Sequence, residues 1–263
     1  MSGINVARFS ALLESASAPL LIDVRREDAF LKDTRTPAGA LRRDPERVSE
    51  WGPELPSAGT VTVCCVHGHE VSQGVATALN AQGREAYFLE GGIAEWQAAG
   101  GTSDNKPAGA STRWVTRERP KIDRIACPWL IRRFVDKDAE FLYVPTQEVR
   151  DTAKARDAIP YDIPDVHFSH EGGLCSFDAF LKHYRLNDPA LQQLALIVRG
   201  ADTARLDLAP QAPGLAAISL GLSRNFADDH EMLKHGMVLY DALYSWCREG
   251  QDELHTWNPA AYA

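Results

Sequence analysis

Short apolar runs separated by polar turns dominate the first hundred residues of the chain. The runs 19–25, 61–64 and 86–89 have the length and the aliphatic content of buried strands. Across 71–79, valine and leucine recur every fourth residue, the spacing of one helix face. Strands that alternate with helices predict an α/β domain in which helices flank a parallel sheet.

Helical periodicity takes over in the second half of the chain. Residues 128–134 have the pattern of an amphipathic helix, and proline is tolerated in the first turn of a helix, so we expect a helix to begin at Pro128. Asp188 before Pro189 is the pattern of a capped helix start. These patterns predict a helix-rich α+β domain, with helices at 128–134, 176–186, 189–200, 215–222 and 228–248 and a strand at 140–145.

A polar segment separates the two patterns. Residues 102–111 are small or polar and include proline and glycine, which is the composition of a linker. We therefore expect a first domain at 1–102, a linker at 103–111 and a second domain at 112–263.

Composition narrows the class of protein. The net charge of −8 disfavours a general nucleic-acid binder. The sequence has no apolar run of the ~20 residues that a membrane span needs, and its first residues lack the pattern of a signal peptide. Its five cysteines form no CxxC pair, which favours reduced thiols and a cytoplasmic location.

Cys65 is the candidate nucleophile. It follows the apolar run 61–64 and precedes the helix predicted for 72–79, so it meets unpaired helix amides and the positive end of the helix dipole. Both favour a thiolate and can hold an anion. Cys64 lies on the strand and is expected to be buried and inert. The candidate anion-holding loop consists of Val66, His67, Gly68, His69, Glu70 and Val71.

Three stretches together resemble a rhodanese domain from about residue 6 to residue 101. They are Leu-Ile-Asp-Val-Arg at 21–25, the loop at 65–72, and Leu-Glu-Gly-Gly-Ile-Ala-Glu-Trp at 89–96. The resemblance implies a sulfurtransferase in which Cys65 carries a persulfide between a small-molecule donor and a thiol or cyanide acceptor, with no cofactor required. Asp23 and Arg25 would then brace the loops at the strand end.

The loop departs from active rhodaneses in its charge. It contains Glu70 and neither arginine nor lysine, so an anionic donor such as thiosulfate is expected to react weakly. His67 and His69 could offset that charge when they are protonated. A phosphatase of the same fold would need an arginine to clamp phosphoryl oxygens at the loop end, where this chain has Val71.

The second half resembles the C-terminal domain of ChrB-type chromate-resistance proteins. The matching stretches are 124–134, 168–177 and 239–244. The resemblance implies a role in chromate sensing or resistance and makes chromate a candidate partner. Members often carry a DNA-binding region before this domain, and a rhodanese-like domain in its place argues against a repressor.

The second half also contains residues suited to two kinds of site. Arginines in the basic stretch 113–133 could bind an oxyanion, with Cys127 as a further thiol at a helix start; the candidates are Arg124, Cys127 and Arg132. The residues also allow a divalent metal ion, held by His170, Asp202 and His230. The stretch 230–235 is one residue too long for the HExxH pattern of metalloproteases, so a protease is disfavoured.

The leading hypothesis is a rhodanese-like sulfurtransferase joined to a ChrB-type domain that acts in the chromate or oxidative stress response. One alternative is an oxyanion or metal sensor without turnover. Another is a metal-dependent redox enzyme in the second domain. The sequence leaves open the sulfur donor, the acceptor, the metal and the oligomeric state.

Overall fold

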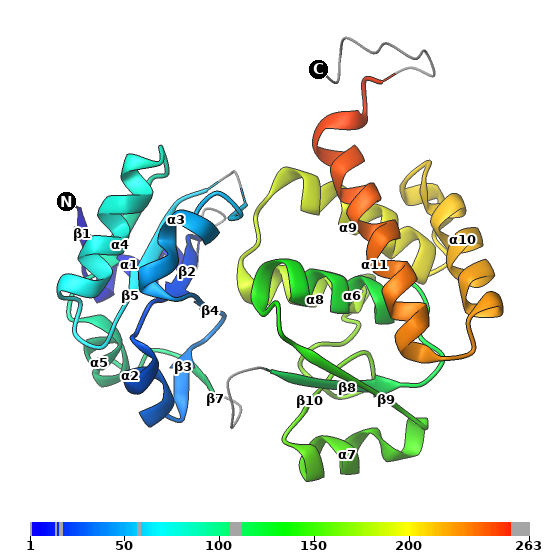
Figure 1. Ribbon diagram of the computed structural model, residues 1–263, viewed down its shortest axis with the longest axis horizontal. Helices are drawn as coiled ribbons and strands as arrows, with labels where there is room; N and C mark the ends of the chain where they lie inside the picture. Colours follow the sequence, from blue (N-terminus) through cyan, green and yellow to red (C-terminus); the bar gives the residue numbers. More distant parts are fainter. Residues whose placement is uncertain (1, 14, 16–17, 57–58, 106–111, 254–263) are drawn as a thin grey trace.

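The chain folds into an α/β domain followed by a helix-rich domain (Figure 1). The computed structural model describes residues 2–13, 15, 18–56, 59–105 and 112–253. In the first domain every strand of the central sheet runs parallel to its neighbours, in the order β1-β6-β5-β2-β4. These strands are β1 Gly3–Ile4, β2 Leu20–Asp23, β4 Leu41–Arg42, β5 Val61–Cys64 and β6 Ala86–Leu89.

Both faces of this sheet are covered, as the continuous apolar runs predicted. Alternate residues of a strand face opposite sides, so Val63 enters the core cluster on one face while Cys64 enters the cluster on the other. The first-domain helices are α1 Val6–Leu13, α2 Glu27–Lys32, α3 Val48–Trp51, α4 Glu70–Ala81 and α5 Gly92–Ala98, with a 3-10 turn η1 at Pro45–Arg47.

The first domain extends beyond its predicted end. Residues 103–105 of the expected linker form strand β7 Ser103–Asn105, which pairs antiparallel with β3 Arg35–Pro37. The N–H and C=O groups of the two strands therefore form hydrogen bonds with each other. Residues 106–111, the rest of the expected linker, lie outside the described residues.

The second domain combines a small parallel sheet with a group of helices, which confirms the predicted α+β class. Its strands follow the order β10-β8-β9, and β9 covers the strand predicted at 140–145. The strands are β8 Arg113–Arg117, β9 Glu140–Val144 and β10 Ile159–Pro160. The helices are α6 Asp123–Leu130, α7 Val149–Arg156, α8 Ser176–Tyr184, α9 Pro189–Asp202, α10 Ala212–Asn225 and α11 Asp229–Ser245, with shorter turns η2 Ile131–Val135, η3 Thr146–Glu148, η4 Leu206–Leu208 and η5 Trp246–Gly250.

Helix α6 corrects one prediction from the sequence. It begins at Asp123, so Pro128 lies inside the helix and not in its first turn. A proline inside a helix has no N–H to donate to the carbonyl four residues earlier, here that of Arg124. The hydroxyl of Tyr143 donates to that carbonyl instead, at 3.3 Å, which compensates for the missing bond.

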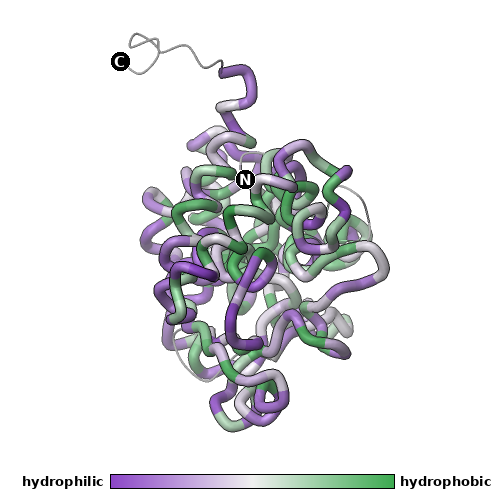
Figure 2. Tube along the Cα trace, turned by 90° about the vertical axis from the view of Figure 1, so that its right-hand side faces the viewer, coloured by the Kyte–Doolittle hydropathy of each residue, from purple (hydrophilic) through white to green (hydrophobic). Residues whose placement is uncertain are grey.

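The two domains pack against each other. Apolar residues of both belong to one buried cluster, and Figure 2 shows hydrophobic segments gathered inside the molecule with hydrophilic segments at its outer turns. At the junction, Arg43 donates to the carbonyls of Phe134 and Val135 at 2.6 and 2.9 Å, and Arg185 donates to the carbonyl of Ala38 at 2.9 Å. Among the described residues, no helix is both long and apolar enough to cross a membrane.

Candidate functional site

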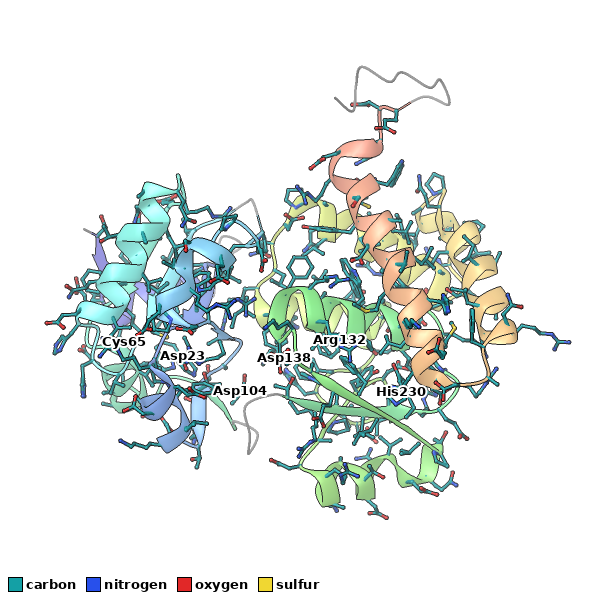
Figure 3. All side chains as sticks on the ribbon, viewed as in Figure 1. Asp23, Cys65, Asp104, Arg132, Asp138 and His230 are labelled. Atoms are coloured by element: carbon teal, nitrogen blue, oxygen red, sulfur yellow. The ribbon has the colours of Figure 1, made fainter. Side chains whose placement is uncertain are left out.

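Cys65 stands between the end of β5 and the start of α4, as the sequence predicts (Figure 3). Its side chain is 6% exposed, and it lies under a rim of exposed residues that belong to the same loop. That rim consists of Val66, His67, His69 and Glu70. The thiol therefore lies at the floor of the loop, and a substrate must pass these exposed residues to reach it.

The loop offers its amides to a bound group. Within the part of the chain that the structure describes, none of the N–H groups from Val66 to Ser72 donates a hydrogen bond, and the first bonded amide is that of Gln73, to the carbonyl of His69 at 3.1 Å. These N–H groups lie at the N-terminus of the twelve-residue helix α4, where the helix dipole adds to their positive potential. The arrangement can stabilise a thiolate or a persulfide anion.

Two glycines hold this loop against the next turn of the chain. Gly68 has φ +72°, and a Cβ there would lie 2.4 Å from the carbonyl oxygen of Leu89. Gly92 has φ +61°, and a Cβ there would lie 2.4 Å from the carbonyl oxygen of Cys65. The amide of Ile93 donates to that oxygen at 2.9 Å. The Gly-Gly pair at 91–92 therefore allows backbone to pack on backbone behind Cys65.

Gly92→Ala should destabilise the chain and disturb the loop. An L-residue at this left-handed φ costs about 1–2 kcal/mol, and its Cβ would also clash with the carbonyl of Cys65. Thermal denaturation measures the loss. Gly74→Ala is the matched control, because Gly74 lies inside α4 with open space around it and alanine there should add about 0.5–1 kcal/mol. Equal effects of the two substitutions would contradict the packing described here.

The two adjacent cysteines differ in their surroundings. The sulfur of Cys65 lies 3.2 Å from the hydroxyl of Ser72, which also lies 3.2 Å from the carbonyl of His69. Cys64 is fully buried, its sulfur lies 3.5 Å from the carbonyl of Ile22, and burial raises its pKa well above the ordinary value of a thiol. Of the two, Cys65 is the one placed to react.

Asp23 and Arg25 form a buried ion pair at the end of β2. The Nε of Arg25 lies 3.0 and 2.9 Å from the two carboxylate oxygens of Asp23, and both side chains are at most 1% exposed. Arg25 also reaches Asp33 at 2.8 Å and the carbonyl of Arg35 at 3.1 Å. The pair ties three segments together at the sheet edge, and its role in bracing the loops stays a prediction.

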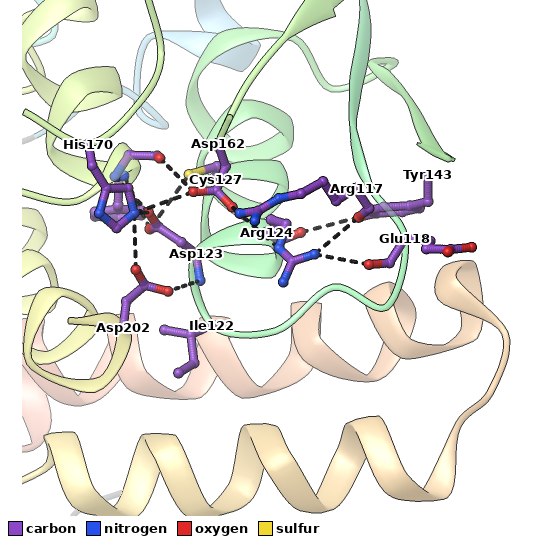
Figure 4. A network of polar contacts seen from close by, with 12 residues as sticks. Arg117, Glu118, Ile122, Asp123, Arg124, Cys127, Tyr143, Asp162, His170 and Asp202 are labelled. Carbon is purple, nitrogen blue, oxygen red and sulfur yellow. Dashed lines mark hydrogen bonds and ion pairs between the residues drawn. The ribbon is translucent and has the colours of Figure 1, made fainter. Parts of the chain in front are cut away.

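A second cluster of functional groups lies in the helix-rich domain (Figure 4). The Nε2 of His170 lies 3.2 Å from a carboxylate oxygen of Asp202, 3.4 Å from Asp162 and 3.5 Å from Asp123. The Asp123, Asp162 and His170 ligand atoms lie within 4.8 Å of one another. Asp123 and Asp162 are almost completely buried, and His170 is 41% exposed at the mouth of the cluster.

Neighbouring groups fix two of the three carboxylates. Asp123 accepts the amides of Ser176 and Phe177, at the start of α8, at 2.6 and 3.2 Å. Asp162 accepts from the hydroxyl of Ser176 at 3.0 Å. It also pairs with Arg117 at 2.8 Å and with Arg124 at 3.3 Å.

Crowding of acidic groups changes their protonation. Burial, reinforced by Asp123 and Asp162, raises the pKa of Asp202 to about 7, and burial also raises the pKa of Asp123. Burial alone would raise the pKa of Asp162 as well, but bonds from His170 and Arg117 outweigh it and lower that pKa. Hydrogen bonds to Asp123 and Asp162 raise the pKa of His170 to about 10. Without a metal, the cluster therefore holds a proton on His170 at neutral pH.

The geometry of the cluster fits a hard divalent cation. Neighbouring ligands of an octahedral ion bound at about 2.1 Å are about 3 Å apart, close to the nitrogen–oxygen distances found here. The ligand atoms that lie close together are two carboxylates and one imidazole, those of Asp123, Asp162 and His170, with Asp202 beside them on His170. Such ligands suit Mg²⁺ or Mn²⁺ better than a thiophilic metal. Asp123 and Asp162 were not anticipated as ligands; their positions at the start of α6 and just after β10 are the only signals in the sequence.

The structure does not bring every predicted residue to this cluster. His230 lies in the first turn of α11, which Asp228 caps, and its ring lies 5.6 Å from that of Tyr143. Cys127 lies in mid-helix, fully buried, and burial raises its pKa well above that of an ordinary thiol, so it does not have the thiolate-favouring setting predicted. Arg132 donates to the carbonyl of Ala139 and stacks over Phe141.

The basic stretch 113–133 therefore does not form the predicted oxyanion site. Its arginines have separate partners: Arg113 pairs with Glu140, Arg133 pairs with Asp241, and Arg119 donates to the carbonyls of Phe226 and Ala227. Only Arg117 and Arg124 converge, and they converge on Asp162.

Comparison with protein families matches each domain separately. The model of the ChrB C-terminal domain matches residues 114–247, and the model of the rhodanese-like domain matches residues 5–99. Protein ChrB of Cupriavidus metallidurans is 32% identical over 134 residues, which are 51% of this chain and 40% of that protein. The chain thus matches less than half the length of this curated relative.

Solved structures similar to this chain align with about two-fifths of it or less. A rhodanese-related protein from Thermoplasma volcanium is 22% identical with a TM-score of 0.36, and covers 40% of this chain and 100% of its own. A rhodanese homolog from Thermus thermophilus is 32% identical with a TM-score of 0.29, and covers 35% of this chain and 96% of its own.

Proposed function

The chain belongs to the family defined by the ChrB C-terminal domain. We propose that it is a two-domain protein of chromate resistance and that its rhodanese-like domain transfers sulfur through a persulfide on Cys65. The observation that supports this most strongly is the position of Cys65 at the floor of a loop whose amides from Val66 to Ser72 donate no hydrogen bond within the described part of the chain. The five cysteines of the chain are free and buried, which suits a reducing compartment such as the cytoplasm.

The chemistry needs two displacements. The Cys65 thiolate attacks the sulfane sulfur of the donor, a new S–S bond forms, and the bond that held this sulfur in the donor breaks to release the remaining anion. The thiolate of an acceptor, or cyanide, then attacks the outer sulfur of the persulfide and restores the Cys65 thiolate. The negative charge on the protein lies on the sulfur of Cys65 before the first step and on the outer sulfur of its persulfide after it. The loop amides and the α4 N-terminus supply fixed dipoles at that place.

The charge of the loop favours a persulfide donor over thiosulfate. Glu70 is exposed in the first turn of α4, and residues 65–72 include neither lysine nor arginine. Glu70 therefore repels a doubly charged donor more than a singly charged one. The experiment that tests the proposal is a sulfur-transfer assay with thiosulfate and with glutathione persulfide as donors, run on the wild-type chain and on Cys65→Ala.

A second candidate function belongs to the C-terminal domain, where we propose a site for a divalent metal ion. The observation that favours it is the convergence of Asp123, Asp162 and Asp202 on one nitrogen of His170 at 3.2–3.5 Å. Bound there, the ion would offer a Lewis-acid or redox centre. This domain would then act on chromate or on another oxidant as a metal-dependent enzyme or as a sensor.

Asp162→Asn should weaken the binding of Mn²⁺ by at least about tenfold, because it replaces a charged ligand by a neutral one. Binding to the wild type at pH 7 should release about one proton or more, because the metal displaces the proton that His170 holds at its pKa of about 10. Affinity should therefore rise with pH. Calorimetry in buffers of different ionisation enthalpy measures both quantities.

Asp207→Asn is the matched control for this measurement. Asp207 is an exposed aspartate that pairs with Arg205 outside the cluster. Equal weakening by both substitutions, or binding without proton release, would exclude the cluster as the metal site.

A further inference from the structure

Ser72 is a polar residue on the buried face of helix α4. The buried residues of that helix are Ser72, Val75, Ala76 and Leu79, which repeat at helical spacing, and Ser72 is 0% exposed. A buried hydroxyl costs free energy unless it is hydrogen-bonded. The oxygen of Ser72 meets two partners, the sulfur of Cys65 and the carbonyl oxygen of His69, each at 3.2 Å.

The single hydroxyl proton of Ser72 serves one of these partners at a time. A serine hydroxyl has one O–H to donate and two lone pairs that accept. While Cys65 is a thiol, its S–H can donate to Ser72, and Ser72 donates to the carbonyl of His69. When Cys65 is a thiolate, the charged sulfur is the stronger acceptor, so the hydroxyl turns to it. The carbonyl of His69 then keeps the amide of Gln73 as a donor, at 3.1 Å.

The charge beside Ser72 changes during sulfur transfer. In the persulfide, the Sγ of Cys65 is the inner sulfur, and the negative charge lies on the outer one. When cyanide attacks the outer sulfur, a C–S bond forms, the S–S bond breaks, and the electron pair of the S–S bond stays on Sγ. Thiocyanate leaves, and Sγ is a thiolate again. A hydrogen bond from Ser72 to Sγ therefore becomes stronger as this step proceeds, which is the condition for accelerating it.

We propose that Ser72 is a catalytic residue, which donates a hydrogen bond to the sulfur of Cys65 as it becomes a thiolate and so speeds the release of sulfur to the acceptor. The part that concerns release rests on the proposed sulfurtransferase function. A hydrogen bond makes a thiolate less basic, and a less basic thiolate is the better leaving group and the weaker nucleophile. Ser72 therefore favours release of sulfur over its capture.

The first experiment measures the thiolate of Cys65 without a sulfur donor. The full chain is alkylated with iodoacetamide across about pH 5 to 10, where protein thiols titrate, and the rate at Cys65 is obtained by peptide mapping. Ser72→Ala should move the midpoint of this profile upward by about one to two pH units, because a hydrogen bond to a charged group is lost. Above both midpoints, Ser72→Ala should react as fast as the wild type or faster, since its thiolate is the stronger nucleophile.

The second experiment follows release in a single turnover. The chain is loaded with sulfur from glutathione persulfide, freed of excess donor and mixed with cyanide, and the formation of thiocyanate is timed. Ser72→Ala should slow this step by about tenfold or more. If the wild type takes up no sulfur, the sulfurtransferase function fails and the role in release fails with it, while the alkylation profile still decides whether the hydrogen bond exists.

Two further variants separate this role from a structural one. Ser72→Thr restores the hydroxyl and should restore the wild-type midpoint. Thr77→Val is the matched control, because Thr77 is exposed on the same helix and its hydroxyl donates to the carbonyl of Gln73 at 2.8 Å. It should leave both the profile and the release rate unchanged.

Ser72→Ala should fold, because alanine is smaller than serine and favours a helix, and thermal denaturation checks this. The proposal is overturned if the midpoint of Ser72→Ala coincides with that of the wild type, or if Thr77→Val moves the midpoint as far. It is also overturned if Ser72→Ala slows alkylation equally at every pH, which is the result expected of a purely structural role.

Discussion

Replacing Cys65 with alanine should reduce sulfur transfer by at least about a thousandfold with either thiosulfate or glutathione persulfide, because the covalent carrier is lost. The fold should change little, since the side chain makes one polar contact, with Ser72 at 3.2 Å. Turnover is followed as thiocyanate formed from cyanide and as persulfide passed to a thiol. With the wild type, glutathione persulfide should give the higher kcat/KM, because Glu70 opposes the thiosulfate dianion.

Cys64→Ala is the control for this result. Cys64 precedes Cys65 and is fully buried on the other face of β5, so its removal should leave turnover close to that of the wild type. If Cys64→Ala abolishes transfer while Cys65→Ala retains it, the wrong thiol has been assigned. If neither substitution changes a measurable rate, the sulfurtransferase proposal fails.

Replacing Arg25 with alanine should lower the free energy of unfolding by about 3–5 kcal/mol, which is the usual cost of leaving a buried charge without its partner. Asp23, which is 0% exposed in the native chain, would keep among the described residues only the amide at position 25 and the hydroxyl of Thr36, at 3.1 Å, as donors to its carboxylate. Arg25→Ala also removes the bond to Asp33 that ties the chain after α2 to the sheet. Urea denaturation followed by circular dichroism measures the loss.

The exposed pair of Lys32 and Asp28 provides the comparison. Its atoms lie 3.9 Å apart and its side chains are at least 73% exposed, so solvent screens the attraction and Lys32→Ala should leave the unfolding midpoint almost unchanged. Equal midpoints for Lys32→Ala and Arg25→Ala would show that the buried pair does not stabilise the domain.

Local sequence patterns were enough to predict the central strands β2, β5 and β6 and helix α4 of the first domain, but not β1, β4 or helices α1 and α3. The strand before Cys65 and the helix after it depend on residues close together in the chain, and the apolar runs matched the buried strands. The Gly-Gly pair at 91–92 could be recognised as a motif. The reason for glycine at position 92 became clear from the structure, where Gly92 lies against the carbonyl of Cys65.

The second domain was harder to predict because its site is assembled from distant segments. Asp123, Asp162, His170 and Asp202 come from a helix start, a strand end, a loop and a helix end. Periodicity describes each element and carries no information on which ends meet. The same limit explains why His230 was expected there, and why the carbonyl bond from Tyr143 that allows Pro128 inside α6 was not foreseen.

The intact mass of the protein, after incubation with glutathione persulfide and removal of the excess donor, tests whether Cys65 carries the sulfur. We expect one added sulfur atom on the wild type, located by peptide mapping on Cys65, present also on Cys64→Ala and absent from Cys65→Ala. An unmodified wild type, or a sulfur atom that remains on Cys65→Ala, would show that Cys65 is not the carrier.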